Sequence, residues 1–247
     1  MISTVFIGLG GFGKSIVKHT YRLTRDLHEQ VGGFDLQNVQ FLFLDPEDPA
    51  DHLTAAEKTA SNVHTYQMSG FTSRMLRDYK SQNSDMADWW YEGLDLDAMH
   101  GYVGVRLAGR LGARLSCDRP AAPVDLYSAL QNVIRATSNQ AKTQKGGFDI
   151  FVVICGSICG GTGAGVSLDL GYLARTAATA RGRHPYVFSC LGLPEAMQVL
   201  KSGASPLDYA NAYAYLKELN WYMYVPGVGE SPRTDRYEFD FGRGITV

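Results

Sequence analysis

The sequence predicts an α/β fold: a doubly wound, mainly parallel sheet with helices on both faces. Two observations support this prediction. Apolar, β-branched runs typical of buried parallel strands lie at residues 4–7, 39–44, 148–155 and 186–191. Segments with helical spacing separate these runs, and glycine-rich turns follow the first and the third. Ligands of such sheets bind outside the carboxyl ends of the strands, so a site is expected at these turns.

The connecting segments predict the helices. After the first strand, Ile16, Thr20, Leu23 and Leu27 form one stripe with Val17 beside it, and we expect this stripe to face the sheet. Residues 102–119 are rich in glycine and arginine, which favours a loop and the start of a helix. The alternation at 236–241 indicates an edge hairpin. Further helices are expected at residues 74–79, 85–91, 124–137, 166–177 and 209–222.

Composition narrows the class of protein. The chain has 247 residues, 45% of them hydrophobic and 19% charged, as in an ordinary globular protein, and we interpret 1–247 as a single domain. A net charge of −2 argues against a broad surface for nucleic acid. The four cysteines form no C-x-x-C pair, which favours reduced thiols and a cytoplasmic location over a zinc site. The sequence has no apolar stretch long enough to predict a membrane span.

The first glycine-rich turn, GLGGFGKS at residues 8–15, fits more than one template. As G-x-G-x-x-G after a strand it matches the dinucleotide fingerprint, with Asp45 at the end of the second strand as a ribose acceptor. As G-x-x-x-x-G-K-S it matches the phosphate loop, with Lys14 on the β- and γ-phosphates and Ser15 on Mg²⁺. A tight turn without any ligand is a third interpretation.

The second glycine-rich turn, Gly160-Gly161-Thr162-Gly163-Ala164-Gly165, follows a buried strand and opens a helix. Glycines at such a junction let backbone N–H groups face a ligand, and the helix N-terminus adds partial positive charge. Neither the dinucleotide fold nor the phosphate-loop fold requires this second turn. Two such turns on neighbouring strands suit a triphosphate held from both sides.

With both turns present in order, the chain resembles the tubulin/FtsZ superfamily, and more loosely the large bacterial tubulin-like proteins. The superfamily carries a glycine-rich loop after its first strand and a G-G-T-G-[ST/A]-G loop after its fourth. The resemblance covers residues 1 to about 220 and implies a Rossmann-like GTPase domain that binds GTP or GDP with Mg²⁺. It also implies a cytoskeletal type of self-association, head to tail into filaments.

The resemblance assigns roles to individual positions. Asp45 and Glu47 take the place of the acids that face magnesium and phosphates, and Arg106 lies where the γ-phosphate loop is expected, although the usual G-A-G-x-N form is missing. Glu195 follows the ribose-side strand, and Asn211 opens the helix whose asparagine reads the guanine edge. The residues expected to contact the nucleotide are Gly10, Gly11, Phe12, Gly13, Ser15, Asp45, Glu47, Arg106, Gly160, Gly161, Thr162, Gly163, Glu195 and Asn211.

Other functions stay open at this point. A nicotinamide-dependent oxidoreductase would use the first turn and Asp45, although Asp45 lies well beyond the spacing of about 20 residues that the fingerprint expects. A phosphate-loop ATPase would require Lys14, and a regulatory domain would bind nucleotide without turnover. The superfamily's acidic catalytic loop is not recognisable before Val247, so no catalytic residue is assigned. We expect hydrolysis to belong to a subunit interface, or the chain to be the N-terminal part of a longer protein.

Overall fold

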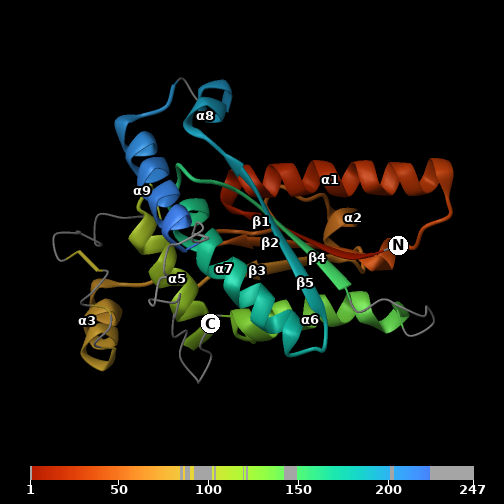
Figure 1. The fold of residues 1–247 in the computed structure, drawn as a ribbon, viewed down its shortest axis with the longest axis horizontal. Coiled ribbons are helices and arrows are strands. Elements are labelled where there is room, and N and C mark those ends of the chain that lie inside the picture. The colour runs from red at the N-terminus through yellow and green to blue at the C-terminus, as the bar shows by residue number, and fades with distance from the viewer. Residues whose placement is uncertain are drawn as a thin grey trace, which may run out of the picture.

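A five-stranded parallel sheet forms the centre of the computed structural model, which describes residues 2–83, 86, 90, 91, 102, 104–118, 120, 122–141, 149–200 and 203–222. Every neighbouring pair of strands is parallel, and the order across the sheet is β3-β2-β1-β4-β5. The predicted α/β class with a doubly wound parallel sheet is therefore confirmed (Figure 1). The strands are β1 (Ser3–Leu9), β2 (Val39–Asp45), β3 (Val63–Gln67), β4 (Asp149–Ser157) and β5 (His184–Gly192).

Helices cover both faces of the sheet. On one face, α1 packs its Val17 and Tyr21 against Phe41 and Phe43 of β2. On the other face, α6 and α7 pack against β1, β2 and β4 and form the larger apolar core (Figure 1). The helices are α1 (Gly10–Val31), η1 (Leu36–Asn38), α2 (Ala55–Lys58), α3 (Ser73–Gln82), α5 (Arg106–Asp118), α6 (Leu126–Ala141), α7 (Gly161–Thr179), α8 (Pro194–Leu200) and α9 (Pro206–Tyr222).

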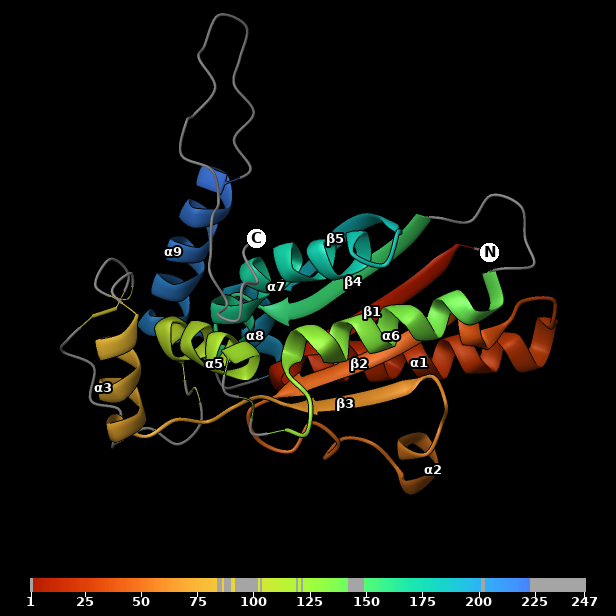
Figure 2. The same ribbon diagram turned by 90° about the horizontal axis from the view of Figure 1, so that it is seen from below.

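The register of the two central strands decides where the functional turns lie. In β1 and β4, Gly8 pairs with Cys155, so both strands end at the same level of the sheet. Each strand then turns directly into a helix, β1 into α1 and β4 into α7. Figure 2 shows α5, α8 and α9 grouped at the end of the sheet to which β4 points. The two glycine-rich turns therefore open side by side at this end.

Only the start of the apolar stripe predicted for α1 reaches the core, where Ile16 packs beside the buried Val17. Leu23 and Leu27 are 70% and 51% exposed, whereas Val17 and Tyr21 are buried against β2. Neighbouring residues of a helix are separated by about 100° of rotation, so choosing residue 16 rather than 17 turns the stripe away from the sheet. Gly13 fixes the rotation of α1 about its axis. A Cβ at residue 13 would overlap the carbonyl oxygen of Cys155, so only the face of α1 that carries Gly13 can approach β4 so closely.

Residues 102–119 were expected to hold a loop and the start of a helix, and the structure gives the helix a much larger share, residues 106–118. They form the helix α5, which is buried along most of its length and packs on α7. A Cβ on Gly109 would overlap the carbonyl oxygen of Gly161, so the glycine allows two helices to cross at close range instead of marking a turn. The arginines of this segment belong to the same helix.

The remaining elements follow the predictions or extend them, with one correction: the strand at 186–191, expected to be buried, belongs to the edge strand β5, where Tyr186 and Phe188 are 42% and 51% exposed. The expected helices at 74–79, 124–137, 166–177 and 209–222 correspond to α3, α6, α7 and α9. The strand β3 and the helix α8 have no counterpart in the predictions. The helix expected at 85–91 lies mostly outside the described residues, and the hairpin at 236–241 lies wholly outside them. No helix in the described part of the chain has the length and apolar character needed to cross a membrane.

Candidate functional site

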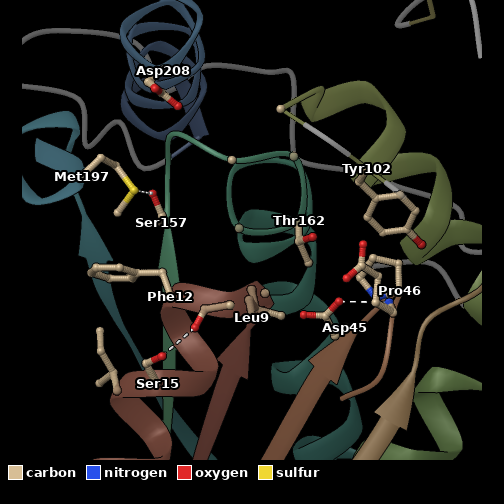
Figure 3. Close-up of a pocket in the computed structure, with 18 of the residues that line it drawn as sticks. Leu9, Phe12, Ser15, Asp45, Pro46, Tyr102, Ser157, Thr162, Met197 and Asp208 are labelled. Carbon is tan, nitrogen blue, oxygen red and sulfur yellow. Dashed lines mark hydrogen bonds between the residues drawn. The ribbon is translucent and has the colours of Figure 1, made fainter. Parts of the chain in front are cut away.

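A cleft of about 740 Å³ lies at the carboxyl ends of the central strands, a size in the range of small-molecule and cofactor sites. The two glycine-rich turns line it together (Figure 3). Phe12 of the first turn and Thr162 of the second therefore share one cleft, as the sequence analysis required. The lining residues are Leu9, Gly10, Gly11, Phe12, Ser15, Ile16, His19, Asp45, Pro46, Glu47, Tyr102, Gly104, Ser157, Gly160, Gly161, Thr162, Gly163, Met197 and Asp208.

The first turn is shaped by two of its glycines. Gly10 has a φ of 63°, a left-handed conformation that glycine adopts without strain, and a Cβ there would lie 3.3 Å from the Cβ of Thr162. The two turns are therefore in close contact at this point. Gly13 lies beneath the turn against β4 and does not line the cleft, so its role is to bring α1 close to the sheet.

The second turn is held by backbone packing and by Ser157 at the end of β4. The Ser157 hydroxyl accepts a hydrogen bond from the backbone N–H of Cys159 at 3.1 Å, which shapes the start of the turn. A Cβ on Gly163 would lie 2.8 Å from the backbone nitrogen of Ser157 and even closer to its carbonyl oxygen. The first turn of α7 can therefore approach the strand only with glycine at residue 163.

Two of the helices that begin at the cleft, α1 and α7, have N-termini without a side-chain cap. The residue at the N-cap position is Leu9 in α1 and Gly160 in α7, and neither has a side chain that accepts a hydrogen bond from the first turn of its helix. Neither first turn contains an acidic residue. By contrast, α2 and α3 are capped by the hydroxyls of Thr54 and Thr72. Free N–H groups and two helix dipoles therefore converge on the cleft, which is the arrangement that binds anions.

Acidic residues line one side of the cleft, where the segment after β2 runs past it. Asp45 is mostly buried, and one of its carboxylate oxygens accepts a hydrogen bond from the backbone N–H of Glu47 at 3.0 Å. Glu47 is exposed and lines the cleft. In the view of Figure 3, Asp45 and Pro46 lie on the side of Tyr102, opposite Phe12 and Met197.

Lys14 lies under the first turn and does not line the cleft. Its side chain is 2% exposed, and its ammonium nitrogen is 2.8 Å from Asp45 Oδ2 and 2.9 Å from Asp51 Oδ1. Burial alone would lower the pKa of Lys14, but the hydrogen bonds and the negative charge of the two aspartates outweigh burial and raise it. The lysine is therefore a charged, internally paired group.

Four of the predicted contact residues lie outside the cleft lining: Gly13, Arg106, Glu195 and Asn211. The side chains of Arg106 and Asn211 bind other parts of the protein. Arg106 donates a hydrogen bond to the carbonyl of Ala164 at 3.3 Å and forms an ion pair with Glu218 of α9 at 2.5 Å. Asn211 is buried, and its amide donates to the carbonyl oxygens of Gly104 and Cys159, both at 2.7 Å. These contacts fasten α5, α7 and α9 around the cleft.

Three other predicted residues, Glu195, Ser15 and Phe12, lie at different places relative to the cleft. Glu195, in the first turn of α8, is exposed and lies outside the lining. Ser15 lines the cleft, and its hydroxyl donates to the carbonyl of Gly11 at 2.9 Å. The ring of Phe12 packs closely on Gly192 at the end of β5. A Cβ on Gly192 would lie 2.5 Å from this ring.

Asp208 is a lining residue that the sequence analysis missed. It lies in the first turn of α9, and its carboxylate accepts hydrogen bonds from the backbone N–H of Ser205 at 2.7 Å and from the Ser205 hydroxyl at 2.9 Å. The segment Ser205-Pro206-Leu207-Asp208 has the form of a helix start, an acid three residues after a serine with proline first in the helix. That signal would have placed Asp208 at a helix N-terminus near the sheet's carboxyl end.

A parallel sheet whose two glycine-rich turns, on adjacent strands, lead into helices without side-chain caps defines a Rossmann-like α/β domain. The chain belongs to the tubulin-like family: the family model described as "Tubulin like" matches residues 5–245. The resemblance to the tubulin/FtsZ superfamily is thereby confirmed. A comparison with curated proteins finds no match.

Proposed function

We propose that the chain binds a guanine nucleotide between the two glycine-rich turns, as a tubulin-like GTPase domain. The observation that carries the proposal is the pair of uncapped helix N-termini, those of α1 and α7, that open on one cleft. Phosphate oxygens would accept hydrogen bonds from the N–H groups of residues 10–12 and 160–163. Thr162 adds a hydroxyl from the second turn.

A magnesium ion is the expected companion of the phosphates. Among the residues that the structure describes, no three His, Cys, Asp or Glu side chains form a group able to hold a metal by themselves. This fits Mg²⁺, which is usually held by one or two carboxylates together with phosphates and water. Asp45 and Glu47 are the two carboxylates available for this at the edge of the cleft, and the ion would neutralise phosphate charge.

The base is expected near the start of α9. Asp208 lines the cleft with its carboxylate oriented by Ser205. A carboxylate accepts two hydrogen bonds, which suits the adjacent N–H donors on the edge of guanine and not the edge of adenine. Both hydrogens of the Asn211 amide are used by backbone carbonyls, so we assign Asn211 to holding this wall of the cleft and leave only its Oδ1 for a base.

Self-association and hydrolysis complete the proposal. Family membership supports head-to-tail contact between copies, and such heterologous contacts produce open filaments when the rotation between subunits does not close. The proposed chemistry consists of positioning phosphate and water and stabilising charge, without a covalent step. We propose that an acidic group from a neighbouring copy, rather than one of the residues assigned here, activates the water.

The first test is to identify the nucleotide released from purified, denatured protein and to titrate GTP and ATP calorimetrically. We expect guanine nucleotide in the extract and preferential binding of GTP. Absence of any guanine preference would contradict the proposal. Sedimentation with and without GTP, at increasing protein concentration, then tests assembly.

A charge variant tests the location of the phosphates. Gly11 lies in the first turn of α1 with nothing within 4 Å of the position of a Cβ, so Gly11→Glu places a carboxylate in the cleft without steric conflict. Gly70, equally open and outside the cleft lining, provides Gly70→Glu as the matched control with the same charge. We expect the first variant to lose GTP binding and the second to retain it. Equal binding by the two variants would place the phosphates elsewhere.

A further inference from the structure

The ammonium group of Lys14 is saturated with hydrogen-bond acceptors. It lies 2.8 Å from Asp45 Oδ2, 2.9 Å from Asp51 Oδ1 and 3.1 Å from the carbonyl oxygen of Asp48. An ammonium group has three donors, and these three acceptors use all of them. Lys14 therefore has no hydrogen left for a phosphate, although the spacing of residues 8–15 matches a phosphate loop.

The three acceptors all belong to one short segment, residues 45–51, which connects β2 to the region before α2. The segment also has its own bonds: Asp45 accepts from the N–H of Glu47 at 3.0 Å, and the Asp48 carboxylate accepts from the N–H of Ala50 at 2.8 Å. Lys14 ties this folded segment to α1. Asp45, Pro46 and Glu47 of this segment line the cleft, and Glu47 is the exposed one of the three.

The opposite charges of Lys14 and Asp45 also affect where a metal ion can bind. Asp45 is mostly buried, and burying a carboxylate is costly unless an opposite charge lies close to it. Lys14 is that partner, so a divalent cation bound directly to Asp45 would lie next to an ammonium group and be repelled. Glu47 has no such neighbour among the contacts that the structure gives for it, and it is exposed to the cleft.

We propose that Lys14 is a positioning residue: it clamps the 45–51 segment to α1, neutralises Asp45, and leaves Glu47 as the carboxylate that meets the magnesium ion. The clamp is a property of the protein without ligand. Its consequence for the metal rests on the proposed guanine-nucleotide function. The two parts are tested separately, so that failure of one is distinguishable from failure of the other.

The clamp is tested in the full chain without nucleotide, by amide hydrogen exchange of residues 45–51. Lys14→Met removes the ammonium group, and Lys18→Met, one turn further along α1, is the matched control. We expect exchange of the Glu47 N–H to become about tenfold faster in Lys14→Met, the change that follows from losing one typical hydrogen bond. The control should exchange like the wild type. Unchanged exchange in Lys14→Met would overturn the clamp.

A double variant keeps the test valid if Lys14→Met does not fold because Asp45 is left unpaired. Lys14→Met/Asp45→Asn removes both charges and keeps the shape of the Asp45 side chain. We expect this variant to fold and to exchange the 45–51 amides as fast as, or faster than, the single variant. A folded double variant with wild-type exchange would overturn the clamp.

The consequence for the metal is tested by calorimetric titration of GTP with excess Mg²⁺ and with EDTA. For Lys14→Met we expect GTP affinity to fall about tenfold in EDTA, because a bare carboxylate then faces the phosphates, and to recover in excess Mg²⁺. Glu47→Gln should lose most of the Mg²⁺-dependent gain in affinity. Complete loss of GTP binding in Lys14→Met with unchanged exchange of residues 45–51 would show direct contact with phosphate and overturn the proposal. Failure of the wild type to bind GTP would refute the proposed function, and hydrogen exchange would still decide the clamp.

Discussion

The contact of Gly13 with β4 yields the sharpest prediction for the fold of the site. A Cβ at residue 13 would lie 2.9 Å from the carbonyl carbon of Cys155 and 3.2 Å from that of Gly8, and still closer to the Cys155 oxygen. Ordinary carbon–carbon contacts begin near 3.5 Å, so Gly13→Ala requires a shift of α1 of at least about 0.6 Å. Both opposing groups are backbone, which cannot move aside as a side chain would.

The expected cost follows from two opposing contributions. Overpacking of this kind typically costs about 1–3 kcal/mol, and a contact with strand backbone belongs at the upper end. Alanine regains up to about 1 kcal/mol of helix propensity relative to glycine. The free energy of unfolding of Gly13→Ala should therefore fall by about 2 kcal/mol, or about 4–8 °C in Tm for a chain of this size.

Gly11→Ala is the matched control for Gly13→Ala. It lies two residues earlier in the same helix turn, with open space at its Cβ position, and should be neutral or stabilised by up to about 1 kcal/mol. Urea unfolding followed by circular dichroism measures both variants. If Gly13→Ala is as stable as Gly11→Ala, α1 does not pack on β4 at the distance described, and the argument for the shape of the first turn is refuted.

Further substitutions test three sets of side-chain contacts in the fold by urea unfolding. The ion pair with Arg22 lowers the pKa of Glu57 to about 2 from its usual value near 4.5, so this carboxylate stabilises the fold above pH 4.5 and loses that effect as pH falls towards 2. The free energy of unfolding of the wild type should therefore fall by about 1–2 kcal/mol more than that of Glu57→Gln between pH 4.5 and 2. This figure is reduced because solvent screens the partly exposed arginine. Parallel curves of stability against pH for the two proteins would contradict the prediction. Arg110→Met should lower the free energy of unfolding by about 3 kcal/mol, because it removes the guanidinium that lies 3.0 Å from the buried Asp169 carboxylate. The double variant Arg110→Met/Asp169→Asn should recover part of this loss. Asn211→Ala should cost about 2–3 kcal/mol by leaving two carbonyl groups without its amide, and a loss below 0.5 kcal/mol would contradict the contacts described.

The strands and both glycine-rich turns could be predicted because their signals are local. Long apolar runs identify buried parallel strands, and a glycine-rich turn directly after one identifies the edge where ligands bind. Strand β3 was not predicted, because its five residues, Val63–Gln67, mix buried and exposed positions without a regular alternation. Such a short, half-polar segment has no distinctive pattern.

The errors come from contacts between segments far apart in the chain. Glycines in α5 indicated a loop, whereas Gly109 serves a close crossing with α7. The spacing of residues 8–15 does not specify where Lys14 points, and its partners Asp48 and Asp51 lie in a segment without a clear pattern. Asn211 was correctly placed on a helix near the cleft, but its bonds to two carbonyl groups depend on the tertiary structure.

The pairing of Gly8 with Cys155 also bears on how the protein matures. The two halves of the cleft come from opposite ends of a long stretch of chain and meet only when β1 and β4 align. Contacts this distant in sequence close late and slowly during folding. A ligand that needs both turns therefore cannot be captured by a nascent or half-folded chain, and its binding selects the completed sheet and stabilises it by mass action.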